Sequence, residues 1–491
     1  MSEQYIRITL PDGSQREYPK GTSGLEIAES ISSGLARVAL SITVNGEIID
    51  LDRPINEDAT IAINTWDTED GQYTFWHSSA HLLAEAVQEL YPEAKFGIGP
   101  PIENGFYYDI DFGEKQITQD DLEAIEKKFL EVARKKSSFE RKEISKEEAL
   151  SFYKEKGNEY KVDLIEGLED GNITFYTQGD FTDLCRGPHI PNTGVVKAIK
   201  LTNLAGAYWR GDNNSKQLTR IYGISFPKQK MLQEYLHRIE EAKRRDHRKL
   251  GKELGIYMID SMVGSGLPLW LPNGTVLRRT LEAFLREEQV KRGYKEVITP
   301  HIGNLELYKT SGHYPYYKDS QYDPIEVDDE EYMLKPMNCP HHHQVYLAEK
   351  HSYRDLPVRL SEYGQVYRYE ASGALSGLMR VRGFCQNDAH IYCRYDQAKD
   401  EFLKVMRLHA RYYDLFGIKD YYMRLSLPDL DKLDKYVDEP EKWLAALKII
   451  REAMIESGYP FREVEGEAAF YGPKVDFMIK SVIGTEYAIS T

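Results

Sequence analysis

Two short segments carry histidine and cysteine at a spacing that suits chemistry. His77 and His81 are four residues apart, and Cys185 and His189 have the same spacing. On a helix, residues i and i+4 lie on one face about one turn apart, so the first pair could share a metal ion or a substrate. Alone the pair is a weak signal, because two surface histidines would look the same. The second pair raises the expectation of a common site.

The segment of the second pair is expected to form a loop. Gly187 and Pro188 lie between its cysteine and its histidine and disfavour a regular helix there. Three histidines and one cysteine could form a tetrahedral zinc site, or a cluster that positions and activates water for ester hydrolysis without a metal. The spacing does not choose between these two.

A second group of charged residues lies further along the chain. Strand alternation would place Arg368 and Glu370 on one face of a strand. The same alternation would place Arg380 and Arg382 on one face of a second strand. Together these side chains would form the charged base of a cleft. Residues 372–377 are typical of the turn that would join the two runs. From these residues alone, a surface hairpin with ion pairs between its strands is slightly favoured over such a cleft.

The elements that must hold these residues begin with a small module. Residues 1–64 predict a ubiquitin-like β-grasp fold, with a hairpin, a helix, a second hairpin and a strand. Ser23 and Glu26 have the spacing of a capping box at the start of the helix. Asn45 and Gly46 predict the tight turn of the second hairpin.

The remaining chain is expected to form a mixed α/β domain, a connector and a third domain. Residues 65–228 would form the α/β domain, with helices predicted at 77–90 and 120–136. Residues 229–250 would form a linker helix, and residues 251–491 the third domain. The fold class predicted for the whole chain is therefore α+β with several domains.

Composition and charge narrow the class of protein. Hydrophobic residues make up 41% of the 491 residues, without a run of about 18 apolar residues or an apolar leader. We therefore expect a cytoplasmic protein with no membrane partner. The four cysteines are too scattered for a disulfide framework.

The net charge of −16 does not exclude a nucleic-acid partner, because local patches decide such binding. The clearest basic patch is the run at residues 243–249, within a helix expected from about Gln229 to Leu254. A solvated helix face and an RNA contact explain this run equally well.

Four motifs together are specific for one enzyme family. HSSAH, IGPPIENGFYYD, TDLCRGPH and GAYWRGD occur in this order and resemble the editing domain of bacterial threonyl-tRNA synthetases. In that family the site hydrolyses serine wrongly attached to threonine tRNA. The resemblance implies a site made of His77, His81, Cys185 and His189, with Asp183, Tyr108 and Lys161 as further candidates.

The second group of residues resembles the catalytic core of the same family. VYRYEASGALSGLMRVRGFCQNDAH is similar to motif 2 of class II synthetases, and the segment leading to Pro300 resembles motif 1, which forms the homodimer interface. The resemblance implies that Arg368 holds the α-phosphate of ATP, which binds with Mg²⁺. It implies that Glu370, Arg380 and Lys474 share in catalysis, and that Met337, Phe384, Gln386, Asp388 and Tyr471 bind threonine or ATP.

Discrimination against valine suggests a metal in this core. An apolar pocket cannot distinguish valine from threonine, whereas zinc with open coordination positions can bind the threonine hydroxyl and amino groups. By resemblance, Cys339 and His390 match two zinc ligands, and the third, a histidine, is expected beyond residue 491. Such a site would also accept serine, which explains a hydrolytic domain in the same chain.

This chain departs from the family pattern in two places. After the cysteine and proline at 339–340 the family has glycine and histidine, whereas this chain has His341, His342 and His343. The additional histidine could be a stray metal ligand or a tolerated change. Residues 481–491 predict an interrupted β-hairpin, and motif 3 and the anticodon-binding domain are missing. We therefore expect a truncated chain that forms threonyl-adenylate poorly or not at all and binds zinc weakly.

The function expected from these residues is that of a threonine–tRNA ligase with hydrolytic editing of Ser-tRNA. Its partners would be L-threonine, ATP and threonine tRNA. One alternative is a stand-alone Ser-tRNA deacylase, which would leave the class II motifs idle. Another is an inactive RNA-binding relative, in which the site residues should be eroded.

Overall fold

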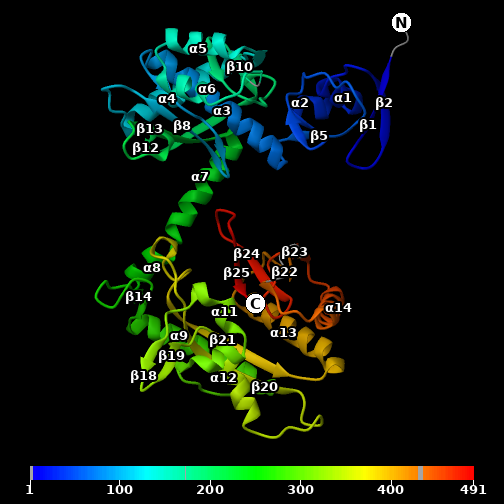
Figure 1. Ribbon diagram of the computed structural model, residues 1–491, viewed down its shortest axis with the longest axis vertical. Helices are drawn as coiled ribbons and strands as arrows, with labels where there is room; N and C mark the ends of the chain where they lie inside the picture. The colour runs from blue at the N-terminus through cyan, green and yellow to red at the C-terminus, as the bar shows by residue number, and fades with distance from the viewer. Residues whose placement is uncertain (1–3, 172, 430–434) are drawn as a thin grey trace. The chain divides into compact units, whose positions relative to one another are not determined.

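The computed structural model describes residues 4–171, 173–429 and 435–491, which form two compact units (Figure 1). The first unit comprises Met1–His237 and the second Arg238–Thr491. Each unit has its own sheets and its own apolar cores. The expected α+β fold class is confirmed.

The first unit begins with a five-stranded sheet in the order β2-β1-β5-β3-β4. Ser23 and Glu26 form the predicted capping box, and Asn45 and Gly46 both have the positive φ that a tight hairpin turn requires. β1 pairs in parallel with β5, as a β-grasp fold requires. The elements are β1 (Tyr5–Thr9), β2 (Gln15–Pro19), α1 (Gly24–Ile31), α2 (Ser33–Val38), β3 (Ala39–Val44), β4 (Glu47–Ile49) and β5 (Ala59–Thr65).

A long helix, α3 (Glu69–Leu90), organises the rest of the first unit. It packs with α4 (Gln119–Arg134) against a sheet in the order β12-β13-β8-β6 (Figure 1). The sheet strands are β6 (Lys95–Phe96), β7 (Pro101–Ile102), β8 (Gly105–Asp111), β12 (Ala198–Tyr208) and β13 (Gln217–Phe226). A smaller layer contains β9 (Glu140–Glu143), α5 (Lys146–Glu155), α6 (Glu159–Glu166), β10 (Thr174–Gln178) and β11 (Phe181–Leu184).

The start of α3 corrects the sequence prediction, which began this helix at His77. The helix begins at Glu69, where the Thr68 side chain accepts a hydrogen bond from the Gly71 backbone N–H. Gly71 looks like a helix breaker in the sequence. In the fold it is needed, because a Cβ there would lie 1.8 Å from the Thr65 carbonyl oxygen. His77 therefore lies well inside a rigid helix.

The second unit contains small sheets covered by helices. Its strand orders are β16-β20-β21, β17-β19-β18, β23-β22-β24-β25 and β14-β15. The strands are β14 (Tyr257–Met258), β15 (Leu269–Trp270), β16 (Lys295–Glu296), β17 (Ile302–Asn304), β18 (Ile325–Val327), β19 (Glu330–Leu334), β20 (Val358–Tyr367), β21 (Gly383–Tyr392), β22 (Tyr421–Leu427), β23 (Phe461–Glu465), β24 (Lys474–Lys480) and β25 (Glu486–Ser490). The interrupted hairpin predicted at residues 481–491 is instead a paired one, in which β25 pairs with β24, a strand that ends before residue 481.

The helices near the boundary of the units differ from the prediction. One basic helix was expected from Gln229 to Leu254, but two occur, because Asp246 accepts a hydrogen bond from the Arg248 N–H and so caps a new helix. The helices are α7 (Gln229–Arg244), α8 (His247–Glu253), α9 (Pro272–Lys291), α10 (Leu305–Thr310), α11 (His313–Tyr316), α12 (Cys339–Leu347), α13 (Tyr395–Leu415) and α14 (Pro440–Ser457). No helix in the described parts of the chain is both long and apolar enough to cross a membrane.

The predicted antiparallel pair at the second group of residues is β20 and β21, in continuous register from Val358 opposite Tyr392 to Tyr367 opposite Gly383. Arg368 and Glu370 were expected within a strand but follow the end of β20. The Arg368 N–H donates to the Arg382 carbonyl at 2.9 Å, so the two chain segments stay paired beyond the strands.

A buried carboxyl group lies in the core of the first unit. Glu85 follows His81 by one turn on α3 and is fully buried, and neither of its oxygens has a hydrogen-bond partner within the described chain. Burial is the main reason that its pKa is raised to about 7; Lys135, 3.7 Å away, counteracts this, whereas Glu89 and Asp180 add to it. Gln178, whose Oε1 is also buried without a partner, lies beside this carboxyl group.

We expect Glu85→Gln to stabilise the protein at alkaline pH relative to the wild type. Glu85 binds its proton up to about pH 7 in the folded chain, against 4.5 for an ordinary glutamate. The folded state thus binds more protons between these values, and the free energy of unfolding falls as pH rises through that window, by about 3 kcal/mol at most. The melting-temperature difference, variant minus wild type, should therefore increase between pH 5 and pH 8. An equal difference at both pH values, as expected for Glu123→Gln on the exposed face of α4, would contradict this.

Candidate functional site

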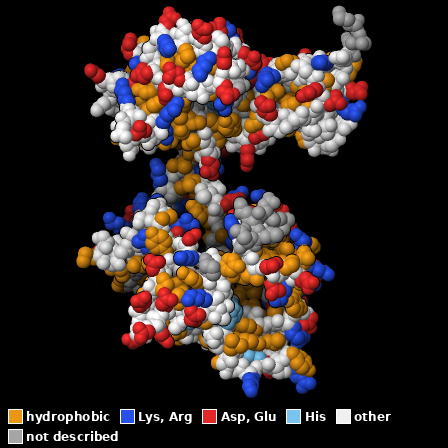
Figure 2. All heavy atoms as spheres, viewed as in Figure 1, with side chains coloured by type: hydrophobic (Ala, Val, Ile, Leu, Met, Phe, Trp, Pro, Cys, Tyr) orange, Lys and Arg blue, Asp and Glu red, His pale blue; other side chains and the backbone are white. Residues whose placement is uncertain are grey.

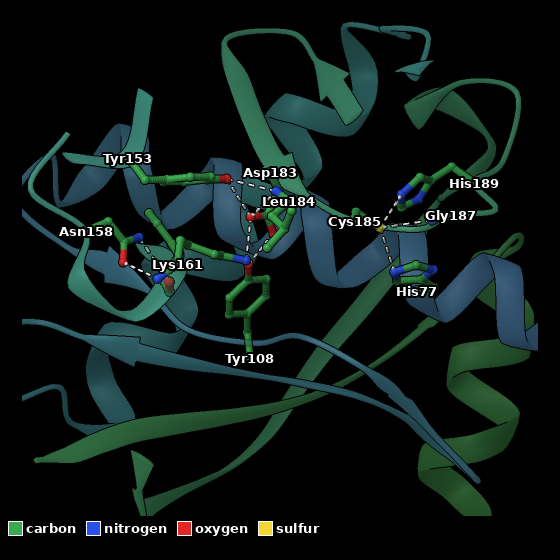
Figure 3. Close-up of polar contacts among 11 residues, drawn as sticks. His77, Tyr108, Tyr153, Asn158, Lys161, Asp183, Leu184, Cys185, Gly187 and His189 are labelled. Atoms are coloured by element: carbon green, nitrogen blue, oxygen red, sulfur yellow. Dashed lines mark hydrogen bonds and ion pairs between the residues drawn. The ribbon is translucent and has the colours of Figure 1, made fainter. Parts of the chain in front are cut away.

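Four side chains predicted to act together meet in the first unit. His77 comes from α3, and Cys185 and His189 from the loop after β11 (Figure 3). His81 follows His77 by one turn on α3. Their ligand atoms all lie within 4.8 Å of one another. His81 and His189 are buried, and His77 and Cys185 are half-buried. Cys185 Sγ lies 3.2 Å from His77 Nε2 and 3.3 Å from His189 Nε2.

The hydrogen bonds of Ser78 determine which nitrogen of His189 carries the proton. Ser78 Oγ donates its single proton to the Thr74 carbonyl at 2.8 Å and accepts from the Ile190 N–H. It lies 3.0 Å from His189 Nδ1, so in this contact Nδ1–H must be the donor. The lone pair of neutral His189 is then on Nε2, which faces Cys185.

A carboxylate from the β-grasp module holds the same loop, and sequence reasoning missed it. Asp50 Oδ1 accepts from the His189 backbone N–H at 2.7 Å, and Oδ2 accepts from the Tyr176 hydroxyl at 2.7 Å. Asp50 is only 8% exposed. Its only signal in the sequence was an aspartate after a short apolar strand, which is typical of any turn.

The four side chains are neutral near pH 7. Burial lowers the pKa of His77 to about 3 and that of His81 to about 4, and it also lowers the pKa of His189. Burial raises the pKa of the Cys185 thiol to about 12. The cluster therefore offers basic nitrogen atoms and a thiol that is a weak nucleophile at this pH.

The three further editing candidates form a separate buried group beside this cluster (Figure 3). Lys161 Nζ lies 2.5 Å from Asp183 Oδ1, and the Tyr108 hydroxyl donates to Asp183 Oδ2 at 2.5 Å. Although burial raises the pKa of Asp183, Lys161 and the hydrogen bonds hold it below its usual value. The buried charges of this group thus form one compensated ion pair, Lys161 with Asp183, and Asp183 is two residues along the chain from Cys185.

In the second unit, several predicted residues line one cavity of about 860 Å³. Arg368, Glu370, Arg380 and Phe384 are among its walls. The Arg368 guanidinium lies 5.2 Å from the centre of the Phe384 ring, and Arg380 Nε lies 3.7 Å from Glu370. Arg382 does not join them. It donates to the Glu370 carbonyl at 3.0 Å instead, so the expected pair of arginines on one face does not form.

Strand alternation on β21 gives other predicted residues a common face. Gln386, Asp388 and His390 are two residues apart on this strand, as Phe384 is from Gln386. Asn338 Nδ2 donates to Asp388 at 3.0 Å from the segment before α12. Met337 precedes Asn338 in that segment and is half-buried.

The two predicted zinc ligands, Cys339 and His390, are both half-buried. His342 Nε2 lies 3.1 Å from Glu362, and His342 Nδ1 lies 2.9 Å from His390 Nδ1. If neutral His342 donates to Glu362, its Nδ1 accepts from His390, and His390 Nε2 keeps a free lone pair. Burial raises the pKa of the Cys339 thiol to about 12, with Asp388 adding to this. In the described chain, the group at residues 77–189 is the only set of three or more candidate ligands found.

The histidine that departs from the family pattern lies away from His390. The centre of the His341 ring is 6.0 Å from that of the Tyr308 ring. His341 Nε2 also lies close to the backbone of Gly303, because a Cβ added there would be 3.1 Å from it. His343 pairs with the Tyr392 hydroxyl at 2.9 Å.

Two other predicted residues lie near the end of the chain. Tyr471 is 58% exposed and packs edge-on against Phe470. Lys474 begins β24, and its Nζ lies 3.2 Å from Asp476. Burial raises the pKa of the Tyr471 hydroxyl, and Cys339 and Asp388 add to this rise, so the hydroxyl lies near these two predicted site residues.

The comparisons with known proteins cover nearly the whole chain. Family profiles match residues 6–65 (TGS domain), 173–222 (Threonyl and Alanyl tRNA synthetase second additional domain) and 321–491 (tRNA synthetase class II core domain (G, H, P, S and T)). Among solved structures, the RNA binding domain of threonyl-tRNA synthetase from Cryptosporidium parvum is 38% identical, with a TM-score of 0.47, covering 50% of this chain and 59% of that chain.

Curated relatives agree in name over almost the full length. The threonine–tRNA ligase of Cytophaga hutchinsonii is 57% identical, over 99% of this chain and 76% of its own length. That of Porphyromonas gingivalis is 56% identical over 99% of this chain and 75% of its own length. That of Bacteroides thetaiotaomicron is 56% identical over 99% of this chain and 76% of its own length. The chain therefore belongs to the threonine–tRNA ligase family.

Proposed function

We propose that the two units carry out two successive reactions of one threonine–tRNA ligase. The second unit would activate threonine with ATP and transfer it to threonine tRNA, and the first would hydrolyse tRNA wrongly charged with serine. The observation that carries the editing half is the neutral cluster of three imidazoles and a thiol within 4.8 Å. For the activation half it is the charged cavity around Arg368.

In the activation cleft, Arg368 would bind the α-phosphate of ATP, which binds with Mg²⁺. A guanidinium donates two parallel hydrogen bonds and can neutralise charge that develops on phosphorus. The threonine carboxylate attacks the α-phosphorus, and pyrophosphate leaves. Glu370 would accept from the adenine amino group, and Phe384 would stack on the base, with Arg380 and Lys474 as further cations.

The threonine pocket would use the polar face of β21. Gln386 could both donate hydrogen bonds to the amino acid and accept them from it, whereas the Asp388 carboxylate would accept them, with Met337 and Tyr471 beside them. Cys339 and His390 would hold a zinc ion, which when bound supplies coordination positions for the threonine hydroxyl and amino groups. The thiol keeps its proton until the metal displaces it, so zinc binding should release a proton.

In the editing site, the lone pair on His189 Nε2 is the best-defined base. It would take a proton from a water molecule, whose oxygen attacks the ester carbon of seryl-tRNA. The ester C–O bond then breaks, and the proton passes to the departing ribose oxygen. Asp183, Lys161 and Tyr108 would orient the substrate. The same donor set also suits zinc, and both modes of water activation remain compatible with the geometry.

We also propose the domain division and the assembly. The β-grasp module would comprise residues 1–64 and the editing domain residues 65–228. The linker would comprise residues 229–250 and the catalytic domain residues 251–491.

A homodimer is supported by apolar side chains exposed on α9 and near Pro300, where Val276 is 67% and Ile298 91% exposed. Hydrophobic side chains also reach the surface of the second unit in Figure 2. The proposed function would place the enzyme in the cytoplasm.

Substitutions in the two sites should separate the two activities. In the full-length protein, Arg368→Ala should reduce charging of tRNA with threonine at least about 100-fold, because charge in the transition state loses its partner. It should leave hydrolysis of Ser-tRNA unchanged. His189→Ala should have the opposite effect. Aminoacylation and deacylation assays measure both, and loss of the two activities together in either variant would contradict the division.

Hydrolysis of Ser-tRNA should persist at acidic pH. An exposed histidine is half protonated near pH 6.5, whereas burial holds His77 and His81 neutral down to about pH 3 and 4 because it lowers their pKa values. The deacylation rate, corrected for spontaneous hydrolysis, should therefore show no inflection between pH 5 and 7. A fall in rate with an apparent pKa near 6.5 would show that the bases are solvated.

Ile298→Asp should dissociate the proposed dimer, because a carboxylate buried in an apolar interface lacks a partner. Sedimentation velocity should give a dimer for the wild type and a monomer for this variant at the same concentration. Ile455→Asp, at a 66% exposed position on α14, is the matched control and should remain dimeric. A dimeric Ile298→Asp protein would place the interface elsewhere.

A further inference from the structure

Five cationic side chains surround a second cavity in the second unit. Its volume is about 480 Å³, and it shares no lining residue with the cavity around Arg368. The cations come from the end of α9, from β20 and from α13. The lining is Arg292, Tyr294, Arg359, Lys404, Arg407, Leu408 and Arg411, which we call the arginine pocket.

Two buried carboxylates hold most of these cations in place. Glu288 lies 3.0 Å from Arg292 and 2.9 Å from Arg411. Glu401 pairs with Arg359 and Lys404, both at 2.7 Å. Although burial raises the pKa of Glu401, Arg359 and Lys404 hold this pKa below its usual value, so the Glu401 carboxylate keeps its negative charge. Five positive charges less two negative ones leave a net +3 at the pocket.

The excess charge lies along one face of α13. Lys404, Arg407 and Arg411 are spaced three and four residues apart, so they form one row about 10 Å long. The Lys404 side chain is 59% and that of Arg411 56% exposed. Arg407 is also exposed, and among the described residues no ion pair or hydrogen bond engages its guanidinium group.

The basic run at residues 243–249 provides a contrast. There Arg244 and Arg245 both pair with Glu241, and Arg248 pairs with Asp246. Both carboxylates are partly exposed, as on a solvated helix surface. In the arginine pocket, Glu288 and Glu401 stand at similar helical spacings from Arg292 and Lys404 but are buried.

We propose that the arginine pocket binds the phosphodiester backbone of tRNA, at a place that shares no lining residue with the cavity around Arg368. This rests on the proposed tRNA substrate. Guanidinium groups match phosphate oxygens in pairs, and a row of them on a helix follows a strand of successive phosphates. The pocket offers one aromatic ring and no base-reading amide, so it contacts the backbone and positions the RNA without reading its sequence.

The test is the salt dependence of tRNA binding to the full chain, measured by filter binding at several KCl concentrations. Arg407→Gln removes a cation without breaking an ion pair. It should lower the magnitude of the slope of log K against log salt by about 1, and the Lys404→Gln/Arg407→Gln/Arg411→Gln triple variant by about 2 to 3. Lys399→Gln on the same helix, where Lys399 pairs with Glu456, is the matched control and should leave the slope unchanged.

The outcomes distinguish tRNA binding from nucleotide binding and from a protein interface. Equal slopes for the wild type and both variants, with melting temperatures unchanged, overturn the proposal. If ATP affinity falls in the variants while the tRNA slope does not, the pocket binds free nucleotide phosphates and the RNA assignment is wrong. If the variants keep the tRNA slope but lose self-association, the surface is a protein interface. Failure of the wild type to bind tRNA would instead refute the proposed function.

Discussion

The buried carboxylate of Asp50 makes the contact on which the hydrolytic cluster depends. It accepts hydrogen bonds from the His189 backbone N–H and the Tyr176 hydroxyl, and so joins the β-grasp module to the loop that carries Cys185. Burial raises the pKa of Asp50, and these two hydrogen bonds partly offset that rise. A loop containing glycine and proline has few backbone bonds of its own, so this outside acceptor fixes where His189 lies.

In both units, a buried ion pair lies beside neutral imidazole groups, so the charge near these groups is balanced. In the first unit, Lys161 and Asp183 form a buried ion pair next to neutral imidazoles. In the second, Lys335 lies 3.6 Å from Glu362, and Glu362 is linked through His342 to His390. An unpaired buried charge would be costly, whereas a paired one can orient a ring and select its tautomer. The reactive nitrogen atoms thereby keep their lone pairs.

The sequence predicted those features of the fold that depend on residues a few positions apart. The capping box at Ser23 and the turn at Asn45 follow from chemistry within three or four residues, and the pairing of β20 with β21 follows from alternation. The predicted start of α3 at His77 was wrong, because the helix begins at Glu69, where the absence of a side chain on Gly71 allows the close approach of the Thr65 carbonyl. Asp50, Ser78 and His342 were missed as supports, since each acts on a residue 48 or more positions away. Spacing brought out His77, His81, Cys185 and His189, whereas Cys339 and His390 came from the family resemblance alone.

The most direct test of the neutral cluster is the ¹⁵N chemical shifts of its imidazoles, measured from pH 4.5 to 8 in protein labelled at histidine. The structure predicts that His189 is protonated at Nδ1 and unprotonated at Nε2, because Ser78 Oγ can only accept from it. It also predicts that His77 and His81 do not titrate above pH 5, and that burial holds the pKa of His189 well below its ordinary value. Protonation of His189 at Nε2, or titration of any of the three near pH 6.5, would contradict a cluster kept neutral by burial.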